Sequence, residues 1–147
     1  MSSLKKLLKK KKYTQIPLSL TATNHFEIKA TLNGVSGKFI LDTGASNTCV
    51  GIDKIEHFKL TSKDSKIKAA GAGAIDMETQ ISTKNKLSIG DWKMKKIKIV
   101  LFDLVHVNEA LTQHKAETVD GIIGADILLK GNAIIDYKTK KLYLNIK

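Results

Sequence analysis

Residues 39–50 read FILDTGASNTCV, and this stretch places a carboxylate at the end of an apolar strand. Its first three residues predict a buried strand, and Asp42 follows them directly. Thr43 and Gly44 then begin a turn, because glycine lets the backbone bend sharply and approach a ligand closely. Free backbone amides in such a turn can donate hydrogen bonds to the carboxylate. The stretch therefore predicts an acid held in a tight loop.

Two later segments are suited to lie around this loop. Ile122, Ile123 and Gly124 form an apolar pair that ends in glycine, and we expect them in the core beneath the Asp42 loop. Further upstream, two extended arms flank a tip of small residues, and a glycine-rich hairpin of this kind is suited to move as a lid over a site. The residues of that tip are Gly71, Ala72, Gly73 and Ala74.

The rest of the chain reads mainly as β-structure. HFEIKATLNG (25–34) alternates apolar and polar residues, which is typical of a half-buried strand, and NGVSG (33–37) is turn chemistry. LVHVNEALTQHK (104–115) is the best helix candidate, with a loop holding one helical turn as the alternative. DGIIGADILLKG (120–131) predicts a short strand, a break at Gly124 and a brief helix. The sequence therefore predicts a mainly β domain with one or two short helices.

ILDTGAS (40–46) resembles the active-site signature of retropepsin-like aspartic proteases, and GIIGADIL (121–128) resembles their second, apolar-glycine element. The order of elements is also similar, from an N-terminal hairpin through the loop, flap and short helix to a C-terminal strand. The resemblance spans about residues 15–146 and is nearest to the bacterial single-domain members. It implies a retropepsin-like half-barrel that closes its active site as a homodimer, with a peptide or protein as substrate.

The chemistry of such proteases needs two adjacent carboxylates, one ionised and one protonated, which share a proton because both cannot ionise cheaply. This chain supplies one Asp-Thr-Gly. Asp126 is a candidate for the second acid, but its place near the start of a short helix favours N-capping or a scaffold hydrogen bond. A two-fold homodimer, which brings Asp42 to its own copy, is the simpler solution.

The resemblance also implies roles for individual residues. Asp42 would be catalytic, Thr43 would brace the paired loops, and Gly44 and Ala45 would support the loop and offer backbone to substrate. The tip at 71–74 would close over an extended peptide. The hypothesis is therefore an aspartic endopeptidase with an Asp42 dyad, and the alternative is a catalytically weak peptide-binding module on the same fold.

Two departures from the family pattern concern the cleft and the dimer contacts. The segment 105–118 is longer than in compact viral relatives, so it could reshape the cleft or the interface. Viral members often carry an arginine beside the apolar-glycine element, where this chain has Ala125.

The 147 residues predict a basic N-terminal tail over 1–14 and a protease domain over 15–147. Six of the 25 lysines lie in residues 5–12, and there is no arginine, which argues against a specific nucleic-acid reader. Leu4, Leu7 and Leu8 have helical spacing, so weak contact of this tail with anionic lipid or RNA is one interpretation. A solvated tail is the preferred one.

The remaining sequence features favour an enzyme without a metal or cofactor. The four histidines lack the spacing of a metal site, and we expect no cofactor. The single cysteine, Cys49, excludes an internal disulfide and reads as a small buried residue rather than a reactive thiol. With no export signal evident, the family likeness suggests a bacterial cytoplasmic protein.

Overall fold

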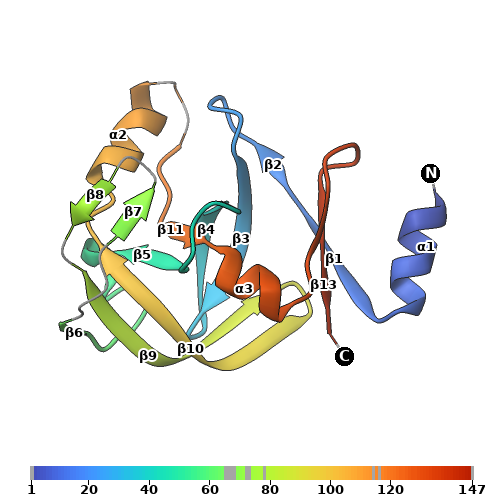
Figure 1. Cartoon of the computed structure of the whole chain (residues 1–147), viewed down its shortest axis with the longest axis horizontal. Coiled ribbons are helices and arrows are strands. Elements are labelled where there is room, and N and C mark those ends of the chain that lie inside the picture. Colours follow the sequence, from blue (N-terminus) through green and yellow to red (C-terminus); the bar gives the residue numbers. More distant parts are fainter. Residues whose placement is uncertain are drawn as a thin grey trace.

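The computed structural model describes residues 2–64, 69–71, 74–77, 79–113, 115 and 117–146; for 2–3, 63–64, 69–71 and 74–77 it describes the backbone alone. Strands make up most of the regular structure in this part of the chain (Figure 1). The elements are, in order, α1 (Ser2–Lys10), β1 (Tyr13–Pro17), β2 (Ser19–Leu20), β3 (Phe26–Leu32), β4 (Val35–Leu41), β5 (Cys49–Gly51), η1 (Ile52–Lys54), β6 (Lys63–Asp64), β7 (Ala69–Gly71), β8 (Ala74–Met77), β9 (Gln80–Ile89), β10 (Trp92–Phe102), α2 (Val105–Gln113), β11 (Gly121–Ile123), α3 (Ala125–Lys130), β12 (Ile134–Asp136) and β13 (Lys141–Asn145).

The main sheet closes on itself. Its strand order is β2-β3-β4-β11-β5-β10-β9-β6, and an additional pairing joins β3 to β9. That pairing uses Thr31 and Leu32, at the end of β3 that lies farthest from β2. The β4–β11 and β5–β10 pairs are parallel, and β11 pairs antiparallel with β5. The result is the mainly β, barrel-like fold that the sequence predicted.

The alternating residues of β3 show how the sequence sets the inside of this barrel. Phe26, Ile28, Ala30 and Leu32 are buried, and the residues between them are more exposed. They join the larger hydrophobic core together with side chains from β4, β9 and β10. Complete burial of a Leu, Ile or Phe side chain contributes about 1.5–3 kcal/mol relative to exposure, so this interior is the main source of stability.

The β3–β4 hairpin reverses direction through two residues with left-handed backbone. Asn33 has φ 51° and Gly34 has φ 84°, which fits the right-handed twist of the flanking strands. The turn predicted from NGVSG is confirmed for Asn33 and Gly34, whereas residues 35–37 already belong to β4. It also brings β4 back beside β3 over its full length, so that β4 ends at Leu41 with Asp42 next.

A second hydrophobic cluster lies under α2. Ile40 and Ile122, from the neighbouring strands β4 and β11, point to this cluster, together with Leu111 of α2. Asn108 joins α2 to the segment before β11, because its side chain donates a hydrogen bond to the carbonyl of Val119 and accepts one from the amide of Val119. The helical interpretation of 104–115 is thus confirmed for Val105–Gln113.

The N-terminal region differs from the preferred expectation of a solvated tail. Residues 2–10 form α1, and its Leu8 is buried, with only 4 % of its surface exposed. β1 starts at Tyr13 and pairs with β13, which also pairs with β12 to complete a three-stranded sheet. The burial of Leu8 and the pairing of the two ends of the chain are not visible in the local sequence.

The expected lid is described in part. β6 pairs with β9, with Lys63 opposite Ile81 and Asp64 opposite Gln80, at the edge of the main sheet. Between β6 and β9 in the chain, β7 and β8 pair antiparallel, with Gly71 opposite Ala74. The two arms of the predicted hairpin are therefore present. Ala72 and Gly73 lie outside the described residues.

Candidate active site

The Asp42 loop begins where β4 leaves the barrel, and the backbone fixes its shape. The amide of Asp42 donates to the carbonyl of Ile123 at 3.0 Å, which continues the β4–β11 ladder by one residue. The amide of Ala45 then donates to the Asp42 carbonyl at 3.2 Å and closes the turn. The amide of Gly44 donates to Asp42 Oδ1 at 2.9 Å, as expected from the sequence. The carboxylate is partly exposed and held on one side by its own loop.

Gly124 lies directly beneath this loop. A Cβ atom on Gly124 would be 2.7 Å from the carbonyl oxygen of Ala45 and 2.9 Å from the backbone of Asn47, so only glycine fits without a shift. The next amide, that of Ala125, donates to the same Ala45 carbonyl at 2.7 Å. The apolar-glycine segment therefore lies where the sequence placed it, with Ile122 and Ile123 buried on opposite sides of β11.

Thr48 joins the loop to the start of α3. Its side chain is fully buried, its Oγ1 accepts a hydrogen bond from the amide of Gly124 at 3.0 Å, and it donates to Asp126 Oδ1 at 2.7 Å. Asp126 is thus engaged in a scaffold hydrogen bond, the second of the interpretations left open by the sequence. It does not cap α3, because the residue at the N-cap is Gly124 and no side chain caps the helix there.

Sequence reasoning did not single out Thr48. The one signal available was a hydroxyl residue between the turn and the apolar pair Cys49-Val50, which is a weak signal because threonine is common in strands. Its partners lie 76 and 78 residues away in the chain. Only the tertiary pairing of β11 with β4 and β5 brings them together.

Cys49 is next to this network and is buried, as expected. Its Sγ–H donates to the carbonyl of Asn47 at 3.1 Å. Burial raises the pKa of the Cys49 thiol to about 12, and the negative charges of Asp126 and Asp42 act in the same direction. A thiol with that pKa stays protonated near neutral pH, so Cys49 is a packing residue and not a nucleophile.

An apolar pocket of about 320 Å³ is open next to Asp42. Ile40 and Ile122 line it from the sheet, and α2 supplies a wall. Thr23, His25 and His106 add polar groups, and His25 Nδ1 lies 2.9 Å from Thr23 Oγ1. Neither histidine was a sequence candidate, because each stands alone among residues that carry no motif. The α2 residues that line the pocket are Val107, Ala110 and Leu111, together with His106.

A sequence model described as aspartyl protease matches residues 28–127, about two thirds of the chain, and so covers both the Asp42 loop and the segment beneath it. The chain belongs to the aspartyl protease family. No curated protein sequence matches it.

Solved structures with the same fold are found among aspartic proteases. A retropepsin-like aspartic protease from Rickettsia conorii is 21% identical with a TM-score of 0.61, over 90% of this chain and 89% of that one. The retroviral protease-like domain of Ddi1 from Leishmania major is 17% identical with a TM-score of 0.54, over 86% and 90%. The EIAV protease is 16% identical with a TM-score of 0.53, over 82% and 92%. The fold of this chain is therefore retropepsin-like.

In this member of the aspartyl protease family, the residues expected to act with Asp42 differ in their exposure. Thr43 and Gly44 are exposed on the loop, whereas Gly124 is buried below it. A Cβ atom on Gly44 would be 3.3 Å from Asp42 Oδ1, so a side chain at this position would crowd the carboxylate. The loop therefore places Asp42, Thr43 and Gly44 at the surface of the molecule.

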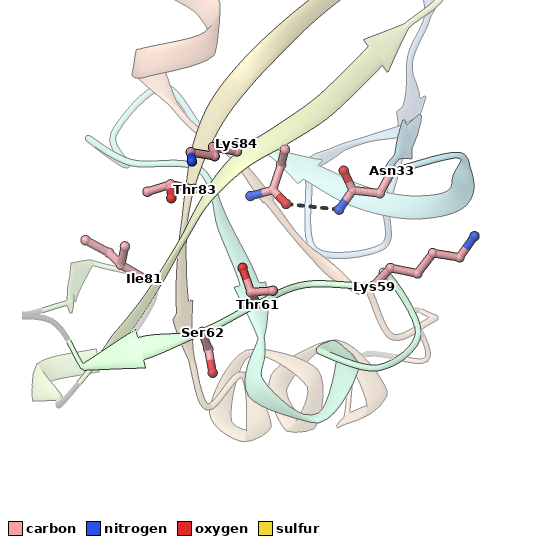
Figure 2. Close-up of a pocket in the computed structure, with 8 residues that line it drawn as sticks. Asn33, Lys59, Thr61, Ser62, Ile81, Thr83 and Lys84 are labelled. Carbon is pink, nitrogen blue, oxygen red and sulfur yellow. Dashed lines mark hydrogen bonds between the residues drawn. The ribbon is translucent and has the colours of Figure 1, made fainter.

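A second, more polar pocket of about 550 Å³ shares no lining residue with the first (Figure 2). Lys59, Thr61, Ser62, Thr83 and Lys84 are exposed on its surface. Its inner wall is a hydrogen-bonded pair of amides, since Asn33 Nδ2 donates to Asn85 Oδ1 at 2.9 Å (Figure 2). Asn85 Nδ2 in turn donates to Ser82 Oγ and to the Ile97 carbonyl. We interpret this wall as part of the barrel scaffold.

The described part of the chain contains no group of three or more His, Cys, Asp or Glu side chains arranged to hold a metal ion. None of its helices is long and apolar enough to cross a membrane.

Proposed function

We propose that this protein is an aspartic endopeptidase that acts as a homodimer, with Asp42 of each protomer at the catalytic centre. The observation that carries the proposal is the partly exposed Asp42, fixed by the Gly44 amide and the β4–β11 ladder beside an apolar pocket. An acid fixed in this way is pre-organised for catalysis, because little reorganisation is needed when substrate binds.

The proposed reaction is general acid–base hydrolysis of a peptide bond. The ionised member of the pair takes a proton from water, and the water oxygen attacks the peptide carbonyl carbon. The protonated member donates a hydrogen bond to the carbonyl oxygen and stabilises the charge that develops there. Proton transfer to the amide nitrogen then lets the carbon–nitrogen bond break. Positioned acid–base groups of this kind contribute about 10²- to 10⁴-fold in rate.

The second acid has to come from a partner copy in this proposal. Asp126 already accepts the buried hydroxyl of Thr48 and lies at the base of the loop, so it is poorly placed to serve as the second acid. A two-fold axis next to the exposed loop would bring each Asp42 to its mate. The exposure of Thr43 and Gly44 in the single protomer supports this arrangement, because those residues would then be covered by the partner loop.

The proposed substrate is an extended peptide. Its side chain would enter the pocket beside Asp42, where Ile40, Ile122 and Leu111 favour an apolar group. Its backbone would pair with the β7–β8 hairpin as an added strand. The bacterial cytoplasmic setting expected from the sequence stays a prediction.

The test compares Asp42→Asn with Asp126→Asn in an assay that detects new peptide termini in a mixed peptide library. Asp42→Asn should lower cleavage at least about a hundredfold while the protein stays folded. Asp126→Asn should keep cleavage measurable, because an amide oxygen can still accept the Thr48 hydrogen bond.

Two outcomes would contradict the proposal. Equal loss of cleavage in both folded variants would favour an intramolecular Asp42–Asp126 pair. Peptide binding by the wild-type protein without any new termini would favour the alternative, a catalytically weak peptide-binding module on the same fold.

A further inference from the structure

We propose that α1 is a docking helix that binds the surface of an anionic membrane. Three features carry the proposal: the contacts that attach the helix to the body of the protein, its partly exposed leucines and its lysines. The proposal does not depend on the catalytic activity proposed above.

The helix is fixed to the body of the protein rather than loose. Leu8 is buried, and Lys12, with φ 66°, ends the helical segment in left-handed backbone. The carbonyl of Lys12 accepts a hydrogen bond from the amide of Ile146 at 2.9 Å, which joins the end of the helix to the C-terminal strand. A helix held at this point presents one constant face to its surroundings.

Two further leucines of α1 stay partly accessible beside the buried Leu8. Leu4 is 40% exposed and Leu7 is 50% exposed, and at a spacing of three residues they lie side by side on the helix. Lys10 and Lys11 follow Leu7 by three and four residues, so they flank the leucines at the helix end. Lys5 and Lys9 are on another side, where they line a surface pocket of about 300 Å³ with Tyr13 and Asp91.

The charge around these leucines is of one sign. Residues 5–12 contain six lysines, and the first acidic residue of the chain is Glu27. Lysines close to an anionic lipid surface each add to binding, and apolar side chains between them can insert at the headgroup boundary. Two exposed leucines within a run of lysines are the pattern of a helix that lies in the membrane interface, and α1 is far too short to span it.

The same features favour lipid over RNA as the occupant. The first 12 residues contain no arginine and no aromatic residue. Sequence-tolerant binding of single strands relies on aromatic stacking as well as charge, so α1 offers RNA charge alone. Exposed leucines would bury no apolar surface against a phosphate backbone, whereas they can do so at the headgroup boundary of a membrane.

The position of α1 suits docking that leaves the candidate active site accessible. In Figure 1, α1 lies at one end of the long axis of the molecule, and α2 and the β7–β8 hairpin lie at the other. A protein held on a membrane by α1 would therefore keep α2, which lines the pocket beside Asp42, at the far end of that axis.

The experiment is co-sedimentation of the full chain with vesicles, either of phosphatidylcholine alone or with phosphatidylglycerol added. We expect binding to the anionic vesicles only, weakened by salt. Lys6→Gln/Lys10→Gln should weaken binding about tenfold or more, and Leu4→Ser/Leu7→Ser should also weaken it. All four positions are exposed, so the variants should fold.

Matched controls separate the helix from general surface properties. Lys95→Gln/Lys98→Gln makes the same charge change on exposed positions of β10, and Leu129→Ser removes an exposed leucine of α3 that is 76% accessible. Both controls should bind vesicles as the wild type does.

Three results would overturn the proposal. The first is vesicle binding that the α1 variants leave unchanged or that the control variants lower equally. The second is tighter binding to single-stranded RNA than to anionic vesicles under the same salt, measured by fluorescence anisotropy. The third is an effect of the leucine variant on self-association, measured by analytical ultracentrifugation, without an effect on vesicle binding.

Discussion

Thr48 shows how one buried hydroxyl can hold a catalytic loop. It accepts from the Gly124 amide and donates to Asp126, so it joins the loop, β11 and α3 at one point. Without the hydroxyl, a buried amide and a carboxylate oxygen would each lose a partner. The cost of leaving such groups unpaired is about 1–3 kcal/mol each.

We therefore predict that Thr48→Val, which keeps the shape of the side chain, lowers the free energy of unfolding by at least about 1–3 kcal/mol. Urea unfolding measures the change. Ser46→Ala, at an exposed position of the same loop, should unfold like the wild type. A Thr48→Val protein of wild-type stability would show that water replaces the hydroxyl at this site.

Cys49 predicts a dependence of stability on alkaline pH. Its thiol pKa is raised from 9.0 to about 12 by burial, so the folded protein keeps a proton that the unfolded chain releases above about pH 9. The contribution of Cys49 to the free energy of unfolding is therefore fully present below about pH 9 and is lost as the pH rises toward 12. Other groups titrate in this range, so the informative quantity is the difference between the wild type and Cys49→Ala.

The expected result is a steeper fall of the unfolding free energy for the wild type than for Cys49→Ala between about pH 9 and 11. Iodoacetamide should also modify Cys49 slowly in the folded protein and quickly in urea. Parallel stability curves for the two proteins, or rapid modification of the folded state, would contradict a buried protonated thiol.

At the scale of elements, the sequence predicted those parts of the fold that local patterns determine. β3 followed from its alternation and the Asn33-Gly34 turn from its chemistry, and both are confirmed. The strand–Gly124–helix segment was also predicted, because an apolar pair ending in glycine suits a strand that stops beneath a loop.

The parts that the sequence did not predict depend on distant pairing. Residues 1–12, which include α1, were expected to be a solvated tail, because they hold six lysines and only three leucines; in the structure Leu8 is buried, and β1, which follows α1, pairs with the distant β13. Thr48 and the pocket histidines were missed for the same reason. His25 follows β2 and His106 is in α2, and nothing in the local sequence of either indicates that they line one pocket with Asp42.

α2 gives a prediction at this scale, which rests on the proposed protease activity. Leu111 is buried and lines the pocket beside Asp42, so Leu111→Ala should enlarge that pocket. Cleavage of a peptide library should shift toward bulkier apolar side chains next to the scissile bond. Leu104 is in the same hydrophobic cluster but does not line the pocket, which makes Leu104→Ala the matched control.

Both alanine variants should lose about 2–5 kcal/mol of stability, because each leaves a cavity in a buried cluster. Only Leu111→Ala should change the preferred side chain, as read by mass spectrometry of the products. The same change in selectivity for both variants would mean that general loosening, and not the wall formed by α2, determines the preference.

At the scale of the whole molecule, the chain presents a single acid, Asp42, in a partly exposed loop beside an apolar pocket. The basic helix α1 lies at one end of the long axis (Figure 1). A single protomer therefore contains half of the machinery that the proposed reaction needs. In the proposed mechanism, activity therefore depends on the pairing of protomers and not only on their concentration.

The sharpest test of that dependence mixes wild-type protein with Asp42→Asn at constant total concentration and lets the protomers exchange. Only a dimer with two Asp42 residues can share a proton between identical acids, so peptide cleavage should fall with the square of the wild-type fraction. Mixing with Lys95→Gln should leave cleavage constant, because this variant changes an exposed charge on β10, a strand that does not line the pocket beside Asp42. If cleavage fell instead in direct proportion to the wild-type fraction, each protomer would be complete by itself, and the second acid would have to be sought within the chain.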